Sequence, residues 1–247
     1  MMAHGAPITR CVAYALLAAS MWASHALAIA GTGTLPAGHA EIELKARYAQ
    51  NPSSESSRLA GIVSVGITSG FQATVESRLL LVEPDGAALR GGFGDTFVEL
   101  KYRLLDEGKA LPATALVPSM RFPTGSSDRG LGAPGYEPGV LVALSKTVGE
   151  TTTTGNAGWS SLTAEDEDAS DTWTVAGAVE HRLTPCWTLL GESVNTIGSG
   201  NADTAVLRAG TSWQATPALK LSVAAAAGLT PQSPDVIVTA GLTIALF

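Results

Sequence analysis

The run Val236-Ile-Val-Thr-Ala-Gly-Leu-Thr-Ile-Ala-Leu-Phe247 decides the fold of this chain. Its even-numbered positions are apolar and mostly bulky, whereas its odd-numbered positions are mostly small or polar. A two-residue period of this kind is typical of a strand with one face in an apolar medium. A chain that ends inside a strand can close an outer-membrane β-barrel, because the last strand pairs with the first. A β-sandwich can also end in a strand, so this run alone leaves both architectures open.

Residues 1–28 have the composition of a secretory signal peptide. Arg10 supplies the positive charge before an apolar stretch from Val12 to Trp22. Ala26-Leu-Ala28 then supplies a small-x-small cleavage site, and an alternative cut follows Ala30. The apolar stretch is too short to span a membrane as a helix. We therefore expect this segment to direct export and to be removed.

The rest of the chain is expected to be held together by its sheet alone. One cysteine, Cys186, would remain after cleavage, so no intramolecular disulfide is expected. Residues 29–39 are predicted to form a short periplasmic segment, too short for a folded plug, before a barrel of residues 40–247. The whole chain holds 15 basic and 22 acidic residues, and cleavage would remove only Arg10 from these. With this acidic balance and no basic patch, nucleic acid is excluded as a partner.

Twelve segments with a two-residue period follow one another, and no stretch of helical period interrupts them. They are expected at about residues 40–49, 58–68, 71–83, 93–105, 110–122, 138–148, 151–162, 172–183, 186–196, 203–214, 218–228 and 235–247. Odd-numbered connections are long and polar, whereas even-numbered ones are short, such as Ser69-Gly70 and Gly149-Glu150. Outer-membrane barrels alternate in this way, with short periplasmic turns and longer extracellular loops, and a β-sandwich has no reason to do so. The sequence therefore predicts an all-β fold, an antiparallel transmembrane up-and-down β-barrel of about 12 strands with both termini in the periplasm.

Charged residues gather on one face of these segments. A charge on the lipid face at the midplane costs roughly 2–4 kcal/mol, so we expect this face to line the lumen. The predicted lumen residues are Glu41, Glu43, Lys45, Arg47, Glu76, Arg78, Asp95, Glu99, Lys101, Arg103, Arg121, Glu180, Arg182, Glu192, Arg208 and Lys220. With nine basic and seven acidic members, the wall is close to balance. It has two interpretations: ion pairs that plug a narrow barrel, or a transverse field that orders polar solutes.

Two further patterns fit this arrangement. Aromatic residues fall near the ends of the predicted strands, where interfacial girdles are expected: Trp173, Trp187, Trp213, Tyr48 and Tyr102. Asp95, which follows Gly94 beside a loop, is expected to accept hydrogen bonds from neighbouring N–H groups of a turn.

Three segments carry a family resemblance. They are Gly92-Phe-Gly-Asp-Thr-Phe-Val-Glu-Leu-Lys-Tyr-Arg-Leu-Leu-Asp106; Pro118-Ser-Met-Arg-Phe-Pro-Thr-Gly125 with Gly130-Leu-Gly and Tyr136-Glu-Pro-Gly139; and the ending Gly228-Leu-Thr…Pro234-Asp-Val…Gly241-Leu. Together they resemble the outer-membrane transporter family named for meta-pathway phenol degradation, over residues 40–247. The resemblance implies a small barrel in the outer membrane of a Gram-negative bacterium. It also implies passage of small, often aromatic or hydrophobic, solutes.

The leading hypothesis is therefore a channel or transporter. Its expected partners are outer-membrane lipid and lipopolysaccharide, the barrel-assembly machinery and a small-molecule solute, and no cofactor is expected. An enzyme acting on outer-leaflet lipid would need a nucleophile and a base near that leaflet. His39 and His181 both fall at the periplasmic end, and no metal-ligand spacing is present. We therefore expect no catalytic, cofactor-binding or metal-binding residue.

A structural or adhesive barrel without transport stays open as the alternative. Glu165-Asp-Glu-Asp168 with Asp171 could hold divalent cations between lipopolysaccharide phosphates. A solvated acidic loop is the simpler interpretation, since runs of charge are usually solvated.

Overall fold

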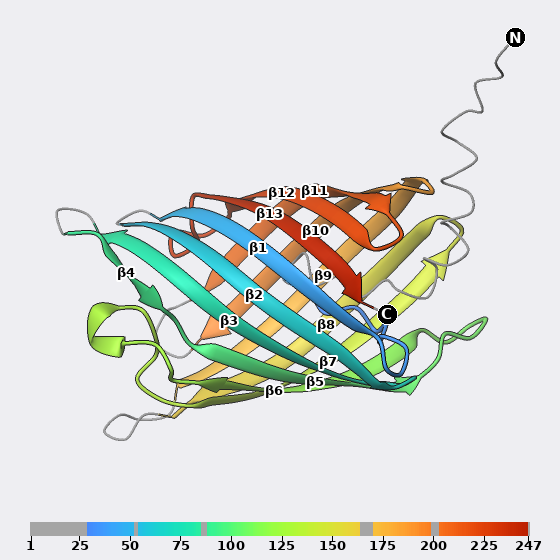
Figure 1. The fold of residues 1–247 in the computed structure, drawn as a ribbon, viewed down its shortest axis with the longest axis horizontal. Helices are drawn as coiled ribbons and strands as arrows, with labels where there is room; N and C mark the ends of the chain where they lie inside the picture. Colours follow the sequence, from blue (N-terminus) through green and yellow to red (C-terminus); the bar gives the residue numbers. More distant parts are fainter. Residues whose placement is uncertain (1–28, 52–53, 85–87, 164–169, 199–202, 247) are drawn as a thin grey trace, which may run out of the picture.

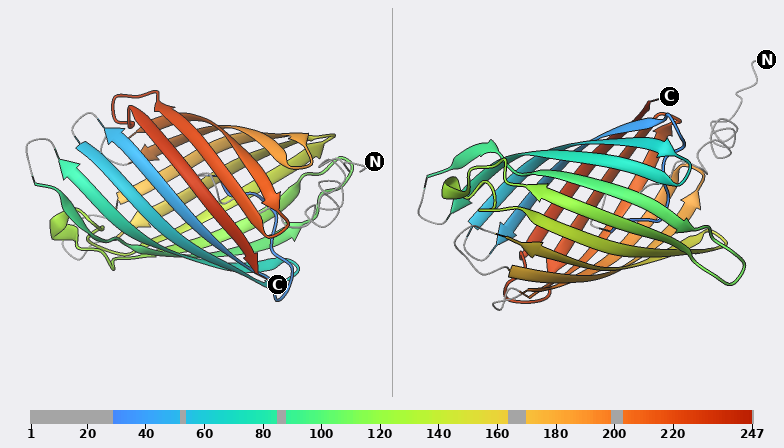
Figure 2. Two further views of the ribbon diagram at one scale, coloured as in Figure 1. Left: turned by 45° about the horizontal axis from the view of Figure 1, so that its top comes forward. Right: turned by 90° about the horizontal axis from the view of Figure 1, so that it is seen from below.

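The computed structural model describes residues 29–51, 54–84, 88–163, 170–198 and 203–246, which form a closed antiparallel β-barrel with tilted strands (Figures 1 and 2). β1 (Ala40–Asn51) pairs with β13 (Val236–Leu246), from Ala40↔Leu246 to Gln50↔Val236. This pairing joins the last strand to the first, so the sheet has no open edge for lipid to meet. The predicted up-and-down barrel is confirmed.

The remaining strands follow in chain order around the wall. They are β2 (Ser54–Thr68), β3 (Phe71–Pro84), β4 (Arg90–Phe93), β5 (Thr96–Leu105), β6 (Ala113–Phe122), β7 (Glu137–Val148), β8 (Thr151–Leu162), β9 (Ser170–Thr184), β10 (Trp187–Gly198), β11 (Thr204–Thr216) and β12 (Leu219–Gly228). β4 and β5 both pair with β3 and are separated only by Gly94 and Asp95. They share one position, so the 13 strands fill 12 positions, as the sequence predicts.

Helices play little part in the described residues. A 3-10 helix, η1 (Ser127–Arg129), lies in the connection between β6 and β7. Within the described ranges, no helix has the length and apolar character needed to cross a membrane.

Two connections depart from the predicted alternation of lengths. The serine-rich run up to Ser57 is predicted to be a loop, but β2 already begins at Ser54 and pairs with β1 as far as Asn51↔Ser54. Conversely, the connection of residues 106–112 is long, because β6 begins at Ala113 and not at residue 110. Pro112, which precedes β6, has no N–H to donate to a neighbouring strand. At these two connections, the pairing register of the barrel therefore determines where the strands begin, and the local preference of serine and of turn residues for loops does not.

The outer surface is apolar, as a lipid-facing wall requires. On β13, Val238 and Leu246 are exposed, whereas Ile237 and Thr239 on the other face are buried. The end of the barrel that carries Ala40 and Leu246 is taken as periplasmic, because even-stranded outer-membrane barrels keep both termini there (right in Figure 1).

Aromatic residues mark both ends of this surface. Trp187 and Trp213 face each other across β10 and β11 near the periplasmic end, with stacked rings whose centroids are 5.9 Å apart. Tyr102, near the same end, is also exposed, and it meets Phe71 edge to face. Tyr48 and Trp173 are exposed near the opposite end. The five side chains thus have the positions expected of interfacial girdles.

Three predictions fall on parts of the chain outside the described residues. They concern the signal peptide of residues 1–28, the acidic run 165–168 and Phe247. Each of them stays a prediction.

Candidate functional site: the barrel lumen

Residues 29–36 enter the barrel and do not form the periplasmic segment that the sequence predicts. Leu35 is fully buried, and its backbone N–H donates to Gln72 Oε1 in β3 at 2.9 Å. Ile29 is buried against Ala176 and Ala178 of β9. Five neighbouring-strand steps separate β3 from β9 in the sheet order, so the segment crosses the lumen. Its glycines and threonines resemble a linker in sequence, but polar groups of the wall satisfy its backbone.

Wall side chains hold this segment, which we call the lumen segment (residues 29–36). Asn156 makes two hydrogen bonds with Ala30: Oδ1 accepts from the backbone N–H at 3.0 Å, and Nδ2 donates to the carbonyl at 2.9 Å. Lys101 Nζ donates to the Gly33 carbonyl at 3.4 Å. Arg103 donates to Thr34 Oγ1 at 3.1 Å. Lys101 and Arg103, two of the predicted lumen cations, therefore anchor the chain itself.

Where the lumen segment passes β2, only a glycine fits in that strand. A Cβ atom on Gly66 would lie 2.1 Å from the Pro36 carbonyl oxygen, which is a clash with backbone. Instead, Gly66 exchanges backbone hydrogen bonds with the preceding turn: it donates to the His39 carbonyl and accepts from Gly38, both at 2.9 Å. The absence of a side chain lets the chain turn tightly from the lumen into β1.

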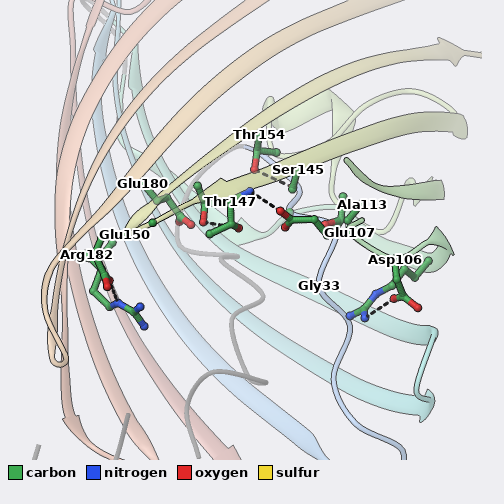
Figure 3. Close-up of a pocket in the computed structure, with 16 residues that line it drawn as sticks. Gly33, Asp106, Glu107, Ala113, Ser145, Thr147, Glu150, Thr154, Glu180 and Arg182 are labelled. Atoms are coloured by element: carbon green, nitrogen blue, oxygen red, sulfur yellow. Dashed lines mark hydrogen bonds and ion pairs between the residues drawn. The ribbon is translucent and has the colours of Figure 1, made fainter. Parts of the chain in front are cut away.

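The lumen segment lines two cavities. The cavity towards the periplasmic end has a volume of about 370 Å³, and its lining includes Gly33, Glu180 and Arg182 (Figure 3). The other, which we call the inner cavity, has a volume of about 490 Å³ and is lined in part by Ile29 and Ala30. Adjacent residues of one short stretch of chain thus line both volumes.

The predicted lumen residues are all buried or half-buried, whereas many of the apolar side chains between them are exposed. Around the inner cavity lie Lys45, Arg47, Glu76, Arg78, Glu99 and Arg208. Around the periplasmic cavity lie Arg103, Glu180 and Arg182. The others line neither of these two volumes: Glu41, Glu43, Asp95, Lys101, Arg121, Glu192 and Lys220.

Ion pairs use several of these charges. Glu192 and Arg208 face each other across β10 and β11 at 2.9 Å. Arg78 pairs along its own strand with Glu76 at 2.5 Å. Lys45 lies 3.4 Å from Glu43. Many of the charges on the inner wall are thus neutralised by ion pairs within the wall.

The extracellular rim is organised around Asp95. Its carboxylate accepts from the backbone N–H groups of Gly125 at 3.0 Å and Ala133 at 2.8 Å, as its expected turn-capping role implies. Arg121 lies 3.6 Å from Asp95 and 2.5 Å from Glu137, across the β6–β7 pair. These contacts fasten the loop of residues 123–136 to the barrel wall.

Sequence reasoning missed two residues of the inner cavity. Arg58 lies directly opposite Arg47 in the β1–β2 register. Phe97 points inward between Asp95 and Glu99, and Arg78 Cζ lies 3.7 Å from its ring centroid. Arg58 begins the strand predicted at residues 58–68, but Ala60 and Ile62, which follow it on the buried face, are apolar, so no alternation of charges marked this face as the inward one.

The periplasmic turns carry their own charge contacts. The backbone N–H of Thr147 donates to Glu107 at 3.0 Å, and together with the Lys146 ammonium it holds the pKa of Glu107 below its ordinary value. The guanidinium of Arg182 hydrogen-bonds Glu150 and lowers the pKa of that carboxyl. Both acids are therefore ionised at neutral pH.

The two histidines lie at the periplasmic end. His181 Nδ1 is 2.9 Å from Thr151 Oγ1, and His39 precedes β1. Among the described residues, no group of three or more histidine, cysteine, aspartate or glutamate side chains is placed to hold a metal ion.

Solved structures share this fold at low sequence identity. An outer-membrane channel from Pseudomonas putida F1 superimposes with a TM-score of 0.67 at 15% identity, over 89% of this chain and 100% of that one. The NanC porin gives 0.62 at 12% identity, over 82% and 98%. The KdgM porin in complex with disordered oligogalacturonate gives 0.60 at 9%, over 84% and 99%.

No curated protein sequence matches the chain. The match to a family is extensive, because it runs through the barrel from the lumen segment to β13. Residues 23–246 match the family described as "Putative MetA-pathway of phenol degradation", and the chain belongs to that family.

Proposed function

We propose that the protein is an outer-membrane channel for small solutes, with aromatic or hydrophobic compounds as the substrate class. One observation carries this proposal. A single stretch of chain, fastened by individual hydrogen bonds, lines two lumen cavities, with residues 31–33 on one and residues 29–30 on the other. In this proposal the stretch is a detachable partition between the two cavities, for which a barrel with a purely structural task would have no need.

The lining of the inner cavity supports the substrate class. Apolar side chains from five parts of the chain reach it: Ile29, Ile62, Phe97, Val117 and Leu141. Small-molecule sites combine such apolar surface with a few placed polar groups. The family description, which refers to phenol degradation, points to the same class. The porins of known structure with the same fold are consistent with passage through the lumen.

Transport in this proposal is passive and requires the lumen segment to move. A solute that enters from outside would rest in the inner cavity, above Ile29 and Ala30. Release of the Asn156 and Gln72 hydrogen bonds would then open a path to the periplasmic cavity. Each such bond contributes about 0.5–1.5 kcal/mol, so thermal motion or a bound solute can break them.

No enzymatic step is part of the proposal. The histidines available as general bases in the described residues, His39 and His181, belong to the periplasmic end. An outer-leaflet lipid would lie at the other end of the barrel.

Planar-bilayer recording of the purified, heat-modifiable protein tests the proposal. We expect discrete conductance steps, and faster swelling of proteoliposomes in small solutes than of empty liposomes. A correctly folded barrel that gives neither steps nor swelling would establish the structural alternative instead.

A further inference from the structure

Two arginines of the inner cavity face each other, and neither belongs to an ion pair of the described residues. Arg47 and Arg58 are direct partners in the β1–β2 register. Like charges directly opposite one another on a sheet are destabilising. Within the described chain, neither guanidinium makes a hydrogen bond or an ion pair, and Arg58 Nε is buried without a partner. This pair is therefore a local excess of positive charge.

The other cations around this cavity already have acidic partners. Arg208 pairs with Glu192, Arg78 with Glu76, and Lys45 with Glu43. Glu99 is the remaining carboxylate on the lining, and it lies two positions from Lys101 on β5. The charge that is left over belongs to Arg47 and Arg58, and one anion with two oxygen acceptors would bridge them. Arginine is suited to this role, because its planar donors match a carboxylate.

Apolar surface completes the cavity. Phe97 presents its ring under Arg78, and Val117 and Leu141 line the same volume. A volume of about 490 Å³ lies within the range of roughly 300–1,000 Å³ that small-molecule sites occupy. An anion without an apolar body would leave this surface in contact with water.

We propose that the inner cavity is a binding site for small monocarboxylates with an aromatic or apolar body. Arg47 and Arg58 hold the carboxylate, and the body packs against Phe97 and its apolar neighbours. This inference rests on the proposed channel function, because the ligand reaches the cavity through the lumen. It narrows the transported class from apolar solutes in general to those that carry one negative charge.

Titration calorimetry of the detergent-solubilised full barrel tests the site with defined probes. Benzoate carries both features, benzyl alcohol lacks the charge, and inorganic phosphate lacks the ring. We expect benzoate to bind at least about ten-fold more tightly than either of the others, because each of them leaves one half of the site unmatched. Benzyl alcohol binding as tightly as benzoate would overturn the arginine clamp. Phosphate binding as tightly would overturn the apolar half.

Arg47→Gln and Arg58→Gln each remove one half of the clamp while keeping an uncharged, hydrogen-bonding side chain. Each should weaken benzoate binding about ten-fold or more. Arg90→Gln is the matched control, because Arg90 is exposed in β4 away from the cavity, and it should leave binding unchanged. Heat-modifiable migration checks that each variant is folded. Unchanged benzoate affinity in both folded cavity variants would overturn the proposal.

Permeation separates this inference from the channel proposal. Single-channel recording of the same protein, with and without benzoate, reports whether ions pass at all. Conductance steps without benzoate binding would refute the proposed binding site but support the proposed channel. Benzoate binding without any conductance would refute the proposed channel but support the proposed binding site.

Discussion

Asn156→Ala should detach the inner half of the lumen segment. Asn156 makes two hydrogen bonds with Ala30, at 3.0 and 2.9 Å. At about 1 kcal/mol for each bond, the substitution removes about 2 kcal/mol of attachment. Ile29, which remains buried against β9, contributes about 1.5–3 kcal/mol through its apolar burial.

These terms set the scale of the effect. Together these interactions favour the attached state of residues 29–30 over the detached state by about 4 kcal/mol, before the entropy of ordering is subtracted. A free-energy difference of that size corresponds to about one detached molecule in a thousand. Loss of about 2 kcal/mol raises the detached fraction roughly 30-fold. In single-channel recordings, the frequency of full openings should rise by a similar factor.

Asn195→Ala is the control for this experiment. Asn195 lies on β10 with an exposed side chain, whose amide donates a hydrogen bond to Ser193 Oγ at 3.4 Å and makes none with the lumen segment. It should therefore leave the opening frequency unchanged. An Asn156→Ala barrel that is folded and opens no more often than the parent protein would refute the assignment of Ala30 as an attachment point.

Four further outcomes are expected. Cysteine placed at Ser127, in the loop of residues 123–136, should react with a membrane-impermeant maleimide on intact cells, whereas cysteine at Thr216 should not; the reverse pattern would invert the barrel. Because the pKa of Glu107 is depressed by the Thr147 N–H, the stabilisation that Glu107 gives to β7 is complete above the ordinary carboxyl pKa and is lost as pH falls through the lowered value; the protection factor of the Thr147 amide against hydrogen exchange should therefore fall on acidification, and Glu107→Gln should abolish that dependence. Trp187→Ala removes the stacked partner of Trp213 and should lower the free energy of unfolding by at least about 0.5–1.5 kcal/mol in urea titrations in lipid vesicles, more than Thr188→Ala does. Deleting Phe247 should reduce the amount of heat-modifiable barrel in the outer membrane; normal assembly would make the bulky set Leu242, Ile244 and Leu246 the signal.

The sequence was informative where the lipid imposes a period of two. On β13, the outward set Val236, Val238 and Leu246 follows from alternation alone, because lipid accepts only apolar side chains there. The charges of β1 and β5 were assigned to the lumen on the same ground. Closure of β1 on β13 then followed from the need to remove the sheet edge.

The lumen segment could not be predicted in this way. Gly31-Thr-Gly-Thr34 has no apolar period, and its position depends on single hydrogen bonds to residues far away in sequence, such as Gln72 and Asn156. The start of β2 was missed for a related reason. Residues Ser54–Ser57 have loop-like composition, yet the register of β1 extends over them and so places Arg58 opposite Arg47. Pairing between strands, and not local propensity, decided both cases.

The central claim is that residues 29–36 close the lumen of a solute channel. Removal of residues 30–36 tests it most directly, with single-channel conductance measured on the folded variant and on the intact protein under the same salt and voltage. The claim predicts a persistently open barrel with a larger conductance and faster liposome swelling than the intact protein. Equal conductance and equal swelling in the two folded barrels would contradict it.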